Sequence, residues 1–255
     1  MTEKRNIAVT LYNVREELKQ DFAATFAAIA KIGYKGVQLS GFNIKEHGAK
    51  EVKELLDAHE FQVAGSHVGL KSLEEEIDFV IEYTHSVGNS YVICPSIPAD
   101  RRETGDDYQR MANTLSEIGF SLKDAGLTFG YHNHAFEFEK FGDQTGMDIL
   151  LENSDASVVT FEPDVYWIAK AGVDPKEYLK KVSNRCPLVH IKDMANDDER
   201  GYAEIGEGII DFAPIFDMQQ QLGTVWYIVE QDTSKRGPLV SAEISFQNMR
   251  KMGRV

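Results

Sequence analysis

Short hydrophobic runs alternate with longer amphipathic segments along the whole chain. Eight runs of four to six residues are rich in β-branched or aromatic side chains, as buried strands are. Between them hydrophobic residues recur at helical spacing, for example at Leu18, Phe22 and Phe26, which is typical of a helix packed on a sheet. The eight runs cover residues 7–11, 36–40, 62–67, 91–94, 128–132, 158–162, 188–192 and 226–230. The pattern therefore predicts an α/β protein with eight strands.

The spacing of the runs favours one closed barrel. Successive runs start 26 to 38 residues apart, about what one strand, a crossover helix and two loops require. Gly33, Gly88, Gly126 and Gly223 each follow a helical segment just before a strand, where a left-handed helix cap favours glycine. A chain of 255 residues without a linker-like stretch therefore predicts a single (β/α)8 TIM barrel spanning residues 1–255.

Two other architectures remain as alternatives. An open doubly wound sheet is disfavoured because the chain has no Gly-x-Gly-x-x-Gly phosphate loop after the first run or elsewhere. Two small domains are the second choice on length alone.

Composition and charge narrow the classes of protein. Hydrophobic residues make up 42% of the chain, which excludes intrinsic disorder. The net charge of -14 argues against nucleic acid or an anionic membrane as a partner. Cys94 and Cys186 are expected to be free thiols. Residues 1–6 lack the apolar core of a targeting segment, and no run could cross a bilayer, so we expect a cytoplasmic protein.

The chemistry of the strand ends differs between the two halves of the chain. In a TIM barrel the carboxyl ends of all strands meet at one mouth, which carries the active site. The first four ends are mostly neutral: Tyr12, Asn13, Gln38, Ser40, Ser66, His67 and Cys94. The last four are dense in titratable groups: His132, His134, Glu137, Glu139, Glu162, Asp164, His190, Lys192, Asp193, Glu230 and Asp232. Charges gathered at a barrel mouth require partners or a metal ion.

Several of these residues have a structural as well as a functional interpretation. His132 and His134 point to the same side if the strand persists, which favours a functional pair. Asp164 follows Pro163, where a strand stops pairing, and the local pattern favours a helix N-cap. Glu162 would then be a carboxylate inside the barrel that needs a cation. For His190 alone, packing and function are equally compatible with the pattern.

Five segments carry a family resemblance. They are Tyr-His-Asn-His-Ala-Phe-Glu-Phe at 131–138, Asp-Val-Tyr-Trp-Ile-Ala-Lys-Ala-Gly at 164–172, Val-His-Ile-Lys-Asp at 189–193, Glu-Ile-Gly-Glu-Gly-Ile-Ile-Asp at 204–211 and Val-Glu-Gln-Asp at 229–232. With them the whole chain resembles the sugar isomerase/epimerase family with the xylose-isomerase-like TIM barrel. That family includes inosose isomerases and dehydratases and ketose 3-epimerases.

The resemblance implies one divalent metal ion, bound by Glu, Asp, His and Glu from the last four strands. Three of these ligands carry over to Asp164, His190 and Glu230. Many members end the fifth strand with a glutamate where this chain has His132, so we expect Glu137, from the following loop, to complete the set. Three carboxylates and one imidazole suit Mn²⁺, Mg²⁺, Co²⁺ or Zn²⁺.

The implied activity is isomerisation or epimerisation of an unphosphorylated ketose or inosose through an enediolate. Glu137 and Glu230 would serve as acid and base, and His132 would take part in proton transfer. We also expect a substrate-binding set made of His67, His134, Trp167 and Lys192. Because an imidazole at position 132 could protonate a leaving oxygen, a lyase that dehydrates or eliminates from a keto sugar or inosose is the alternative.

Three further alternatives are weaker. An endonuclease IV-like DNA repair enzyme has a related barrel, but the net charge and the lack of many extra metal-binding histidines disfavour it. A sugar-binding relative without catalysis is disfavoured by the full set of candidate ligands. The turn 234–238 could hold a substrate phosphate at the start of the last helix, although an exposed basic turn is favoured. The sequence leaves the oligomeric state open.

Overall fold

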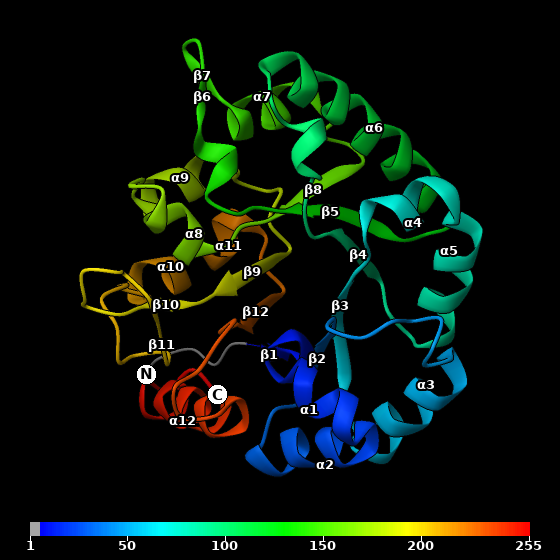
Figure 1. Cartoon of the computed structure of the whole chain (residues 1–255), viewed down its shortest axis with the longest axis vertical. Helices are drawn as coiled ribbons and strands as arrows, with labels where there is room; N and C mark the ends of the chain where they lie inside the picture. The colour runs from blue at the N-terminus through cyan, green and yellow to red at the C-terminus, as the bar shows by residue number, and fades with distance from the viewer. Residues whose placement is uncertain (1–5) are drawn as a thin grey trace.

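Eight parallel strands form a ring at the centre of the computed structural model, which describes residues 6–255 (Figure 1). The ring consists of β1 (Ile7–Thr10), β2 (Gly36–Leu39), β3 (Gln62–His67), β4 (Tyr91–Cys94), β5 (Thr128–His132), β8 (Val159–Glu162), β9 (Leu188–Ile191) and β12 (Trp226–Val229). Hydrogen-bonded neighbours follow the order β8-β5-β4-β3-β2-β1-β12-β9, and an isolated parallel bridge between Asp164 and His190 joins the two ends. The predicted (β/α)8 barrel is thus confirmed as a nearly closed ring, and each predicted strand bound is within one residue of the observed one.

Helices surround the ring on its outer side (Figure 1). They are α1 (Arg15–Gln20), α2 (Phe22–Ile32), α3 (Ala49–Ala58), α4 (Leu70–Glu75), α5 (Ile77–Ser86), α6 (Gly105–Asp124), α7 (Gly146–Asn153), α8 (Val165–Lys170), α9 (Pro175–Lys181), α10 (Ala213–Asp217), α11 (Gln219–Leu222) and α12 (Pro238–Lys251). Short 3-10 helices are η1 (Leu11–Val14), η2 (Ala99–Arg101) and η3 (Phe136–Phe138). Two small antiparallel hairpins pair β6 (Lys140–Phe141) with β7 (Gln144–Thr145) and β10 (Asp193–Met194) with β11 (Tyr202–Ala203).

The amphipathic patterns bury one face of each helix against the strands. In α2 the buried residues include Phe22, Phe26 and Ile29, spaced as the sequence predicts. Gly33 ends this helix in the left-handed region with φ 119°, and Gly88 has φ 72° before β4. A side chain at such a φ would be strained, so glycine sets these helix ends.

A second, smaller hydrophobic core fills the inside of the barrel. It consists of Ala8, Ala64, Ile93, Leu188, Trp226 and Ile228, which come from five different strands. Side chains two positions apart on a strand share a face. The next inward residues after Leu188 and Ile228 are therefore His190 and Glu230, so strand alternation alone carries these two polar side chains to the mouth.

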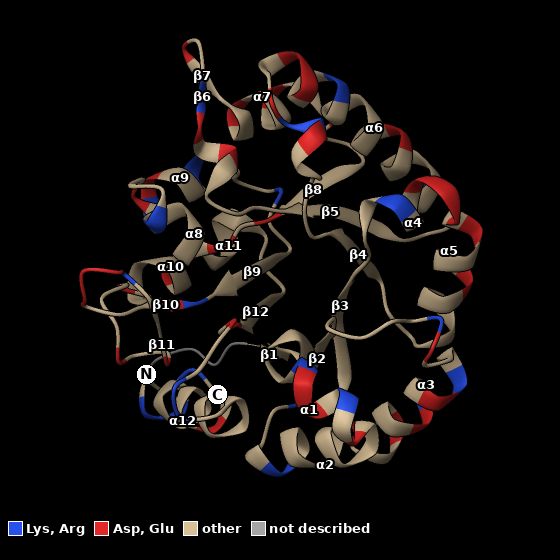
Figure 2. Cartoon of the chain, in the orientation of Figure 1, with Lys and Arg blue, Asp and Glu red and all other residues tan. Residues whose placement is uncertain are grey.

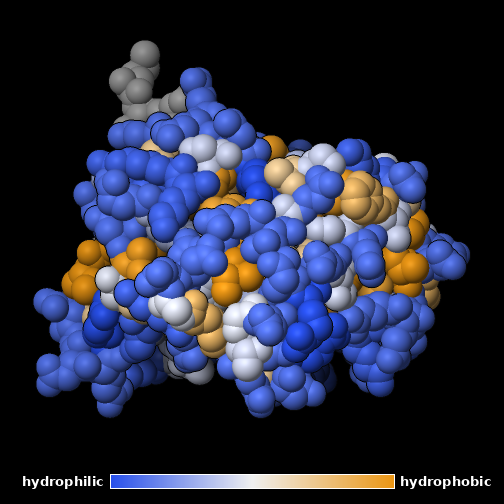
Figure 3. Space-filling model, turned by 90° about the horizontal axis from the view of Figure 1, so that it is seen from above, coloured by the Kyte–Doolittle hydropathy of each residue, from blue (hydrophilic) through white to orange (hydrophobic). Residues whose placement is uncertain are grey.

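The face of the molecule drawn in Figure 3 is mostly hydrophilic. Figure 2 shows charged residues mainly on the outer helices and loops, and in Figure 3 hydrophobic residues form separate patches among hydrophilic ones. Within residues 6–255, no helix has both the length and the apolar character needed to cross a bilayer. Cys94 and Cys186 are buried free thiols, as expected. The expectation that no targeting segment begins the chain falls largely on residues 1–5, which lie outside the described residues.

Candidate active site

A layer of buried polar side chains closes the barrel above its hydrophobic interior. The last residues of β3, β5 and β8 are His67, His132 and Glu162, and His190 and Glu230 come from β9 and the end of β12. Two overlapping groups in this layer have ligand atoms that all lie within 4.8 Å of one another and could hold a metal ion. The groups are His67, His132, Glu162 and His190, and His132, Asp164, His190 and Glu230.

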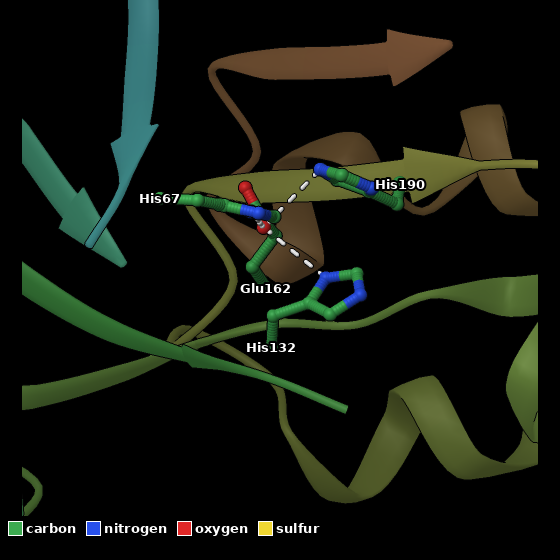
Figure 4. A group of neighbouring side chains, drawn as sticks. All are labelled: His67, His132, Glu162 and His190. Atoms are coloured by element: carbon green, nitrogen blue, oxygen red, sulfur yellow. Dashed lines mark hydrogen bonds and ion pairs between the residues drawn. The ribbon is translucent and has the colours of Figure 1, made fainter. Parts of the chain in front are cut away.

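Glu162 lies at the centre of the first group. Figure 4 shows the imidazoles of His67, His132 and His190 arranged around its carboxylate. Glu162 Oε2 is 2.7 Å from His67 Nε2 and 3.2 Å from both His132 Nδ1 and His190 Nε2. Burial alone would raise the pKa of Glu162, but the neighbouring imidazoles hold it well below its usual range. Glu162 is therefore an ionised carboxylate inside the barrel, and its charge is balanced by histidines.

One carboxylate oxygen of Asp164 accepts hydrogen bonds and the other accepts none. Its Oδ1 accepts hydrogen bonds from the backbone N–H groups of Tyr166 at 2.8 Å and Trp167 at 3.1 Å, so the predicted N-cap of α8 is present. Its Oδ2 is buried without a hydrogen-bond partner, 4.0 Å from His132 Nε2. Burial raises the pKa of Asp164 to about 8. A buried carboxylate oxygen without a donor is the kind of group that a cation stabilises.

Glu230 and His190 complete the second group. His190 Nδ1 lies 3.0 Å from Glu230 Oε2, and both side chains are buried. Burial lowers the pKa of His190, but the carboxylates of Glu162 and Glu230 outweigh it and raise the pKa to about 10. The backbone on both sides of Glu230 is held by Asn13, which donates to Val229 O at 3.3 Å and accepts from Gln231 N at 2.9 Å.

Lys192 places a buried ammonium beside this group. Its Nζ donates to Asp232 Oδ1 at 2.7 Å and to Glu230 Oε2 at 3.4 Å, and lies 3.8 Å from Asp164 Oδ2. The rings of Tyr166, Trp167 and Tyr202 surround it at 4.7 to 5.4 Å. Burial lowers the pKa of Lys192, but the surrounding carboxylates raise it above its usual value, so the side chain stays positively charged.

Glu137 does not lie in either group, which differs from our expectation. It belongs to η3, where the chain turns back on itself after β5. One oxygen accepts from Tyr131 Oη at 2.5 Å and the other from His134 N at 2.7 Å. Burial raises the pKa of Glu137 to about 7. In the described structure His132, not Glu137, stands with Asp164, His190 and Glu230.

A pocket of about 300 Å³ opens above the polar layer. The four expected substrate-binding residues, His67, His134, Trp167 and Lys192, all line it. The rest of the lining is Tyr12, Ser40, Gly41, Pro95, Ser96, His132, Glu230 and Asp232. His134 stacks on Phe136 with ring centroids 5.3 Å apart, and its Nδ1 is buried without a partner. The structure thus brings the candidate ligands and the candidate substrate-binding residues to one place.

Sequence reasoning missed the role of Gln38. This buried residue of β2 donates to Glu162 Oε1 at 2.6 Å, and its Oε1 lies 2.9 Å from His190 Nε2. Strand alternation signals that Gln38 shares a face with Ser40 at the mouth. Its partners lie more than 120 residues away along the chain, and no local pattern indicates them.

Comparison with known proteins agrees with this architecture. The model of the xylose isomerase-like TIM barrel family matches residues 26–252. The chain belongs to that family. The resemblance indicated by the five sequence segments is therefore confirmed, and the proteins that this chain is similar to include inosose dehydratases and sugar phosphate isomerases/epimerases.

Individual relatives of this family member are distant in sequence. An inosose dehydratase of Lacticaseibacillus casei is 25% identical over 247 residues, which cover 81% of each chain. The crystal structure of a sugar phosphate isomerase/epimerase from Parabacteroides distasonis has a TM-score of 0.84 at 25% identity, covering 98% of this chain and 94% of that one. The IOLI protein, whose structure holds a zinc atom, has a TM-score of 0.72 at 16% identity. The match covers 97% of this chain and 96% of the IOLI chain, and it shows a likeness of fold.

Proposed function

We propose that this chain is a divalent-metal-dependent lyase that removes water or another oxygen-linked group from a keto sugar or inosose. The observation that carries the proposal is the engagement of Glu137 outside the pocket. Transfer of a proton between two faces of a sugar uses an acid and a base on opposite sides. Here the pocket offers Glu230 beside the Lys192 ammonium, a set suited to taking one proton and assisting a leaving oxygen.

The residues present fit a divalent metal ion. His132, Asp164, His190 and Glu230 would hold it, and the buried Oδ2 of Asp164 accepts no hydrogen bond. Two imidazoles and two carboxylates are borderline donors that suit Zn²⁺, Co²⁺ and Mn²⁺ better than Mg²⁺, which prefers oxygen. When bound, the ion would supply a Lewis acid that polarises the substrate carbonyl.

The chain's own residues would perform the proton transfers. The Glu230 carboxylate would accept the proton from the carbon next to the carbonyl, because it is ionised and lines the pocket. The proton taken by Glu230 would then pass to the leaving oxygen, which departs as water or an alcohol, while Lys192 Nζ would donate a hydrogen bond to an oxygen that gains negative charge. Trp167 and His134, with ring centroids 5.5 Å apart, would form a wall against the sugar ring.

An isomerase or epimerase is the second candidate. The likeness to the sugar phosphate isomerase/epimerase from P. distasonis favours it. In that reaction the proton would return at a neighbouring carbon or the opposite face, and the unpartnered Nδ1 of His134 is the available group. Both candidates use the same ion and the same base, so they differ in the fate of the enediolate.

An unphosphorylated substrate is part of the proposal. In the turn 234–238, Arg236 Nη2 already lies 2.9 Å from Glu207 Oε2. Its Nε lies 3.8 Å from Glu204 Oε1. A phosphate at this turn would have to compete with both carboxylates, which supports the exposed basic turn expected from the sequence.

The test is a product analysis in D₂O. Protein loaded with Zn²⁺, Co²⁺ or Mn²⁺ would be incubated with inososes and keto sugars, and the masses of the products would be measured by mass spectrometry. We expect a product lighter by one water or by an aglycone, none from chelator-treated protein, and far less from Glu230→Gln than from the wild type. A product of unchanged composition that carries deuterium would support the isomerase instead, and the absence of any metal-dependent product would contradict both candidates.

A further inference from the structure

A buried carboxylate fixes the orientation of a buried amide across the barrel. Glu162 ends β8, Gln38 lies in β2, and Gln38 Nε2 donates to Glu162 Oε1 at 2.6 Å. Both side chains are fully buried. An ionised carboxylate can only accept hydrogen bonds, so the amide nitrogen of Gln38 must face Glu162. The amide oxygen of Gln38 must then face the other way.

That amide oxygen requires a proton on Nε2 of His190. Gln38 Oε1 lies 2.9 Å from His190 Nε2, and an amide oxygen can only accept. Glu162 Oε2, another acceptor, lies 3.2 Å from the same nitrogen. His190 Nε2 is therefore a donor. The ring nitrogen left for an ion is Nδ1, which faces Glu230.

We propose that Glu162 is a positioning residue that, through Gln38, orients His190 with Nδ1 towards the metal ion. The same carboxylate lies 3.2 Å from His132 Nδ1 without a hydrogen bond between them, and His132 Nε2 lies 4.0 Å from Asp164 Oδ2. This inference rests on the proposed function, because it takes His132, Asp164, His190 and Glu230 as the ligands. Acceptors behind metal-binding histidines fix the ring and increase its basicity.

Hydrogen bonding separates this supporting role from that of a ligand. Both oxygens of Glu162 already have donors, Gln38 at 2.6 Å and His67 at 2.7 Å. The Oδ2 of Asp164 has none. An ion among His132, Asp164, His190 and Glu230 would contact an oxygen that accepts no hydrogen bond, whereas an ion beside Glu162 would displace donors that are already in place.

The test compares Zn²⁺ affinity in three variants, measured by competition with a chelating dye. Glu162→Gln replaces one acceptor oxygen with an amide donor, and Gln38→Leu removes the nearer of the two acceptors from His190 Nε2. We expect each to bind Zn²⁺ about 10- to 100-fold more weakly than the wild type. Glu204→Gln is the matched control, since Glu204 is also buried but accepts from Ser241 Oγ at 2.7 Å outside the site, and its affinity should be unchanged.

A spectroscopic readout distinguishes positioning from general loss of structure. In zinc-loaded protein with ¹⁵N-labelled histidine, NMR should show His190 bound through Nδ1, with a slowly exchanging proton on Nε2. In Gln38→Leu, which keeps Glu162 and its contact with His67, that proton should exchange faster while the far-ultraviolet circular dichroism stays unchanged. This variant keeps the test decisive if Glu162→Gln fails to fold.

The outcomes separate this inference from the proposed function. If the wild type binds no Zn²⁺, the proposed function is overturned together with the inference. If it binds Zn²⁺ and both variants bind equally well, or if the ion lies on His190 Nε2, the inference alone is overturned. Retained binding in Asp164→Asn with complete loss in Glu162→Gln would make Glu162 a ligand and would also overturn it.

Discussion

The two halves of the barrel mouth differ in chemistry although they share one architecture. The ends of β5, β8, β9 and β12 supply the candidate ligands, which are charged or imidazole side chains. The first four strands and the segments that follow them supply hydrogen-bonding groups, mostly neutral, and part of the pocket wall, such as Tyr12 and Ser40.

The neutral half positions the charged half. Asn13 holds the backbone on both sides of Glu230, and Gln38 links Glu162 to His190. Amides suit this work because they offer a donor and an acceptor without adding charge to a crowded, buried site. One half of the mouth therefore supplies the reactive groups and the other half orients them, so substitutions in the two halves should have different effects.

The largest effect is expected in the charged half, from Glu230→Gln. An amide can coordinate an ion weakly but cannot accept a proton, so turnover should fall by about 10²- to 10⁴-fold while some metal is retained. Steady-state kinetics and elemental analysis of the same preparation measure both quantities. Full activity in this variant would remove Glu230 from the reaction and would leave the charged half without a base.

Asp164 allows its cap and its metal-binding oxygen to be separated. Asp164→Asn should lose most of the bound metal but unfold within about 0.5 kcal/mol of the metal-free wild type, because asparagine caps helices as well as aspartate does. Asp164→Ala should lose the metal and also cost about 1 kcal/mol of stability. Elemental analysis and urea denaturation in chelator measure the two effects. Normal metal content in Asp164→Asn would contradict the assignment.

Glu137 should affect stability as a function of pH rather than metal content. Its carboxyl has a pKa of about 7 in the folded chain because of burial, against an ordinary value of 4.5. Between these values the unfolded chain gives up a proton that the folded chain keeps, so the free energy of unfolding falls as pH rises. The loss should amount to about 3 kcal/mol by pH 7 and be absent in Glu137→Gln. Urea denaturation of both proteins from pH 4.5 to 7.5 checks this, and parallel pH profiles would contradict it.

The smallest effect is expected in the neutral half, from Ser40→Ala. Loss of one neutral hydrogen bond to a substrate changes binding by about 1 kcal/mol, so KM should rise by less than about 10-fold. The turnover number and the Zn²⁺ affinity should stay the same. A large fall in turnover here would show that the two halves are not divided as described.

The fold could be predicted from the alternation of strand and helix patterns and from the positions of glycines. The eight runs could be placed within one residue, because β-branched runs and αβ-loop glycines are local signals. Strand ends and family motifs also indicate Asp164, His190 and Glu230 as candidate metal ligands, and the structure brings these three side chains together.

The contacts of Glu137 and Glu162 could not be predicted from the sequence. The direction of Glu137 depends on the turn of η3 and on the Tyr131 hydroxyl, which sequence spacing does not reveal. The sequence predicts that Glu162 is a carboxylate inside the barrel, but its partners Gln38 and His67 lie 124 and 95 residues away along the chain. Contacts across a barrel are set by closure of the ring, and no periodic pattern encodes them.

The seam of the barrel has a consequence for its motions. β8 and β9 stand at the two ends of the strand order, and they meet through the bridge between Asp164 and His190 and the bond from His190 N to Pro163 O at 2.9 Å. A seam with few backbone bonds opens more easily than a full ladder and exchanges its amide hydrogens sooner. Two candidate ligands, Asp164 and His190, form this junction, so a bound metal ion would stabilise the ring where it has the fewest backbone bonds. Slower hydrogen exchange at the His190 amide would then indicate that the site is occupied, even when no substrate is present.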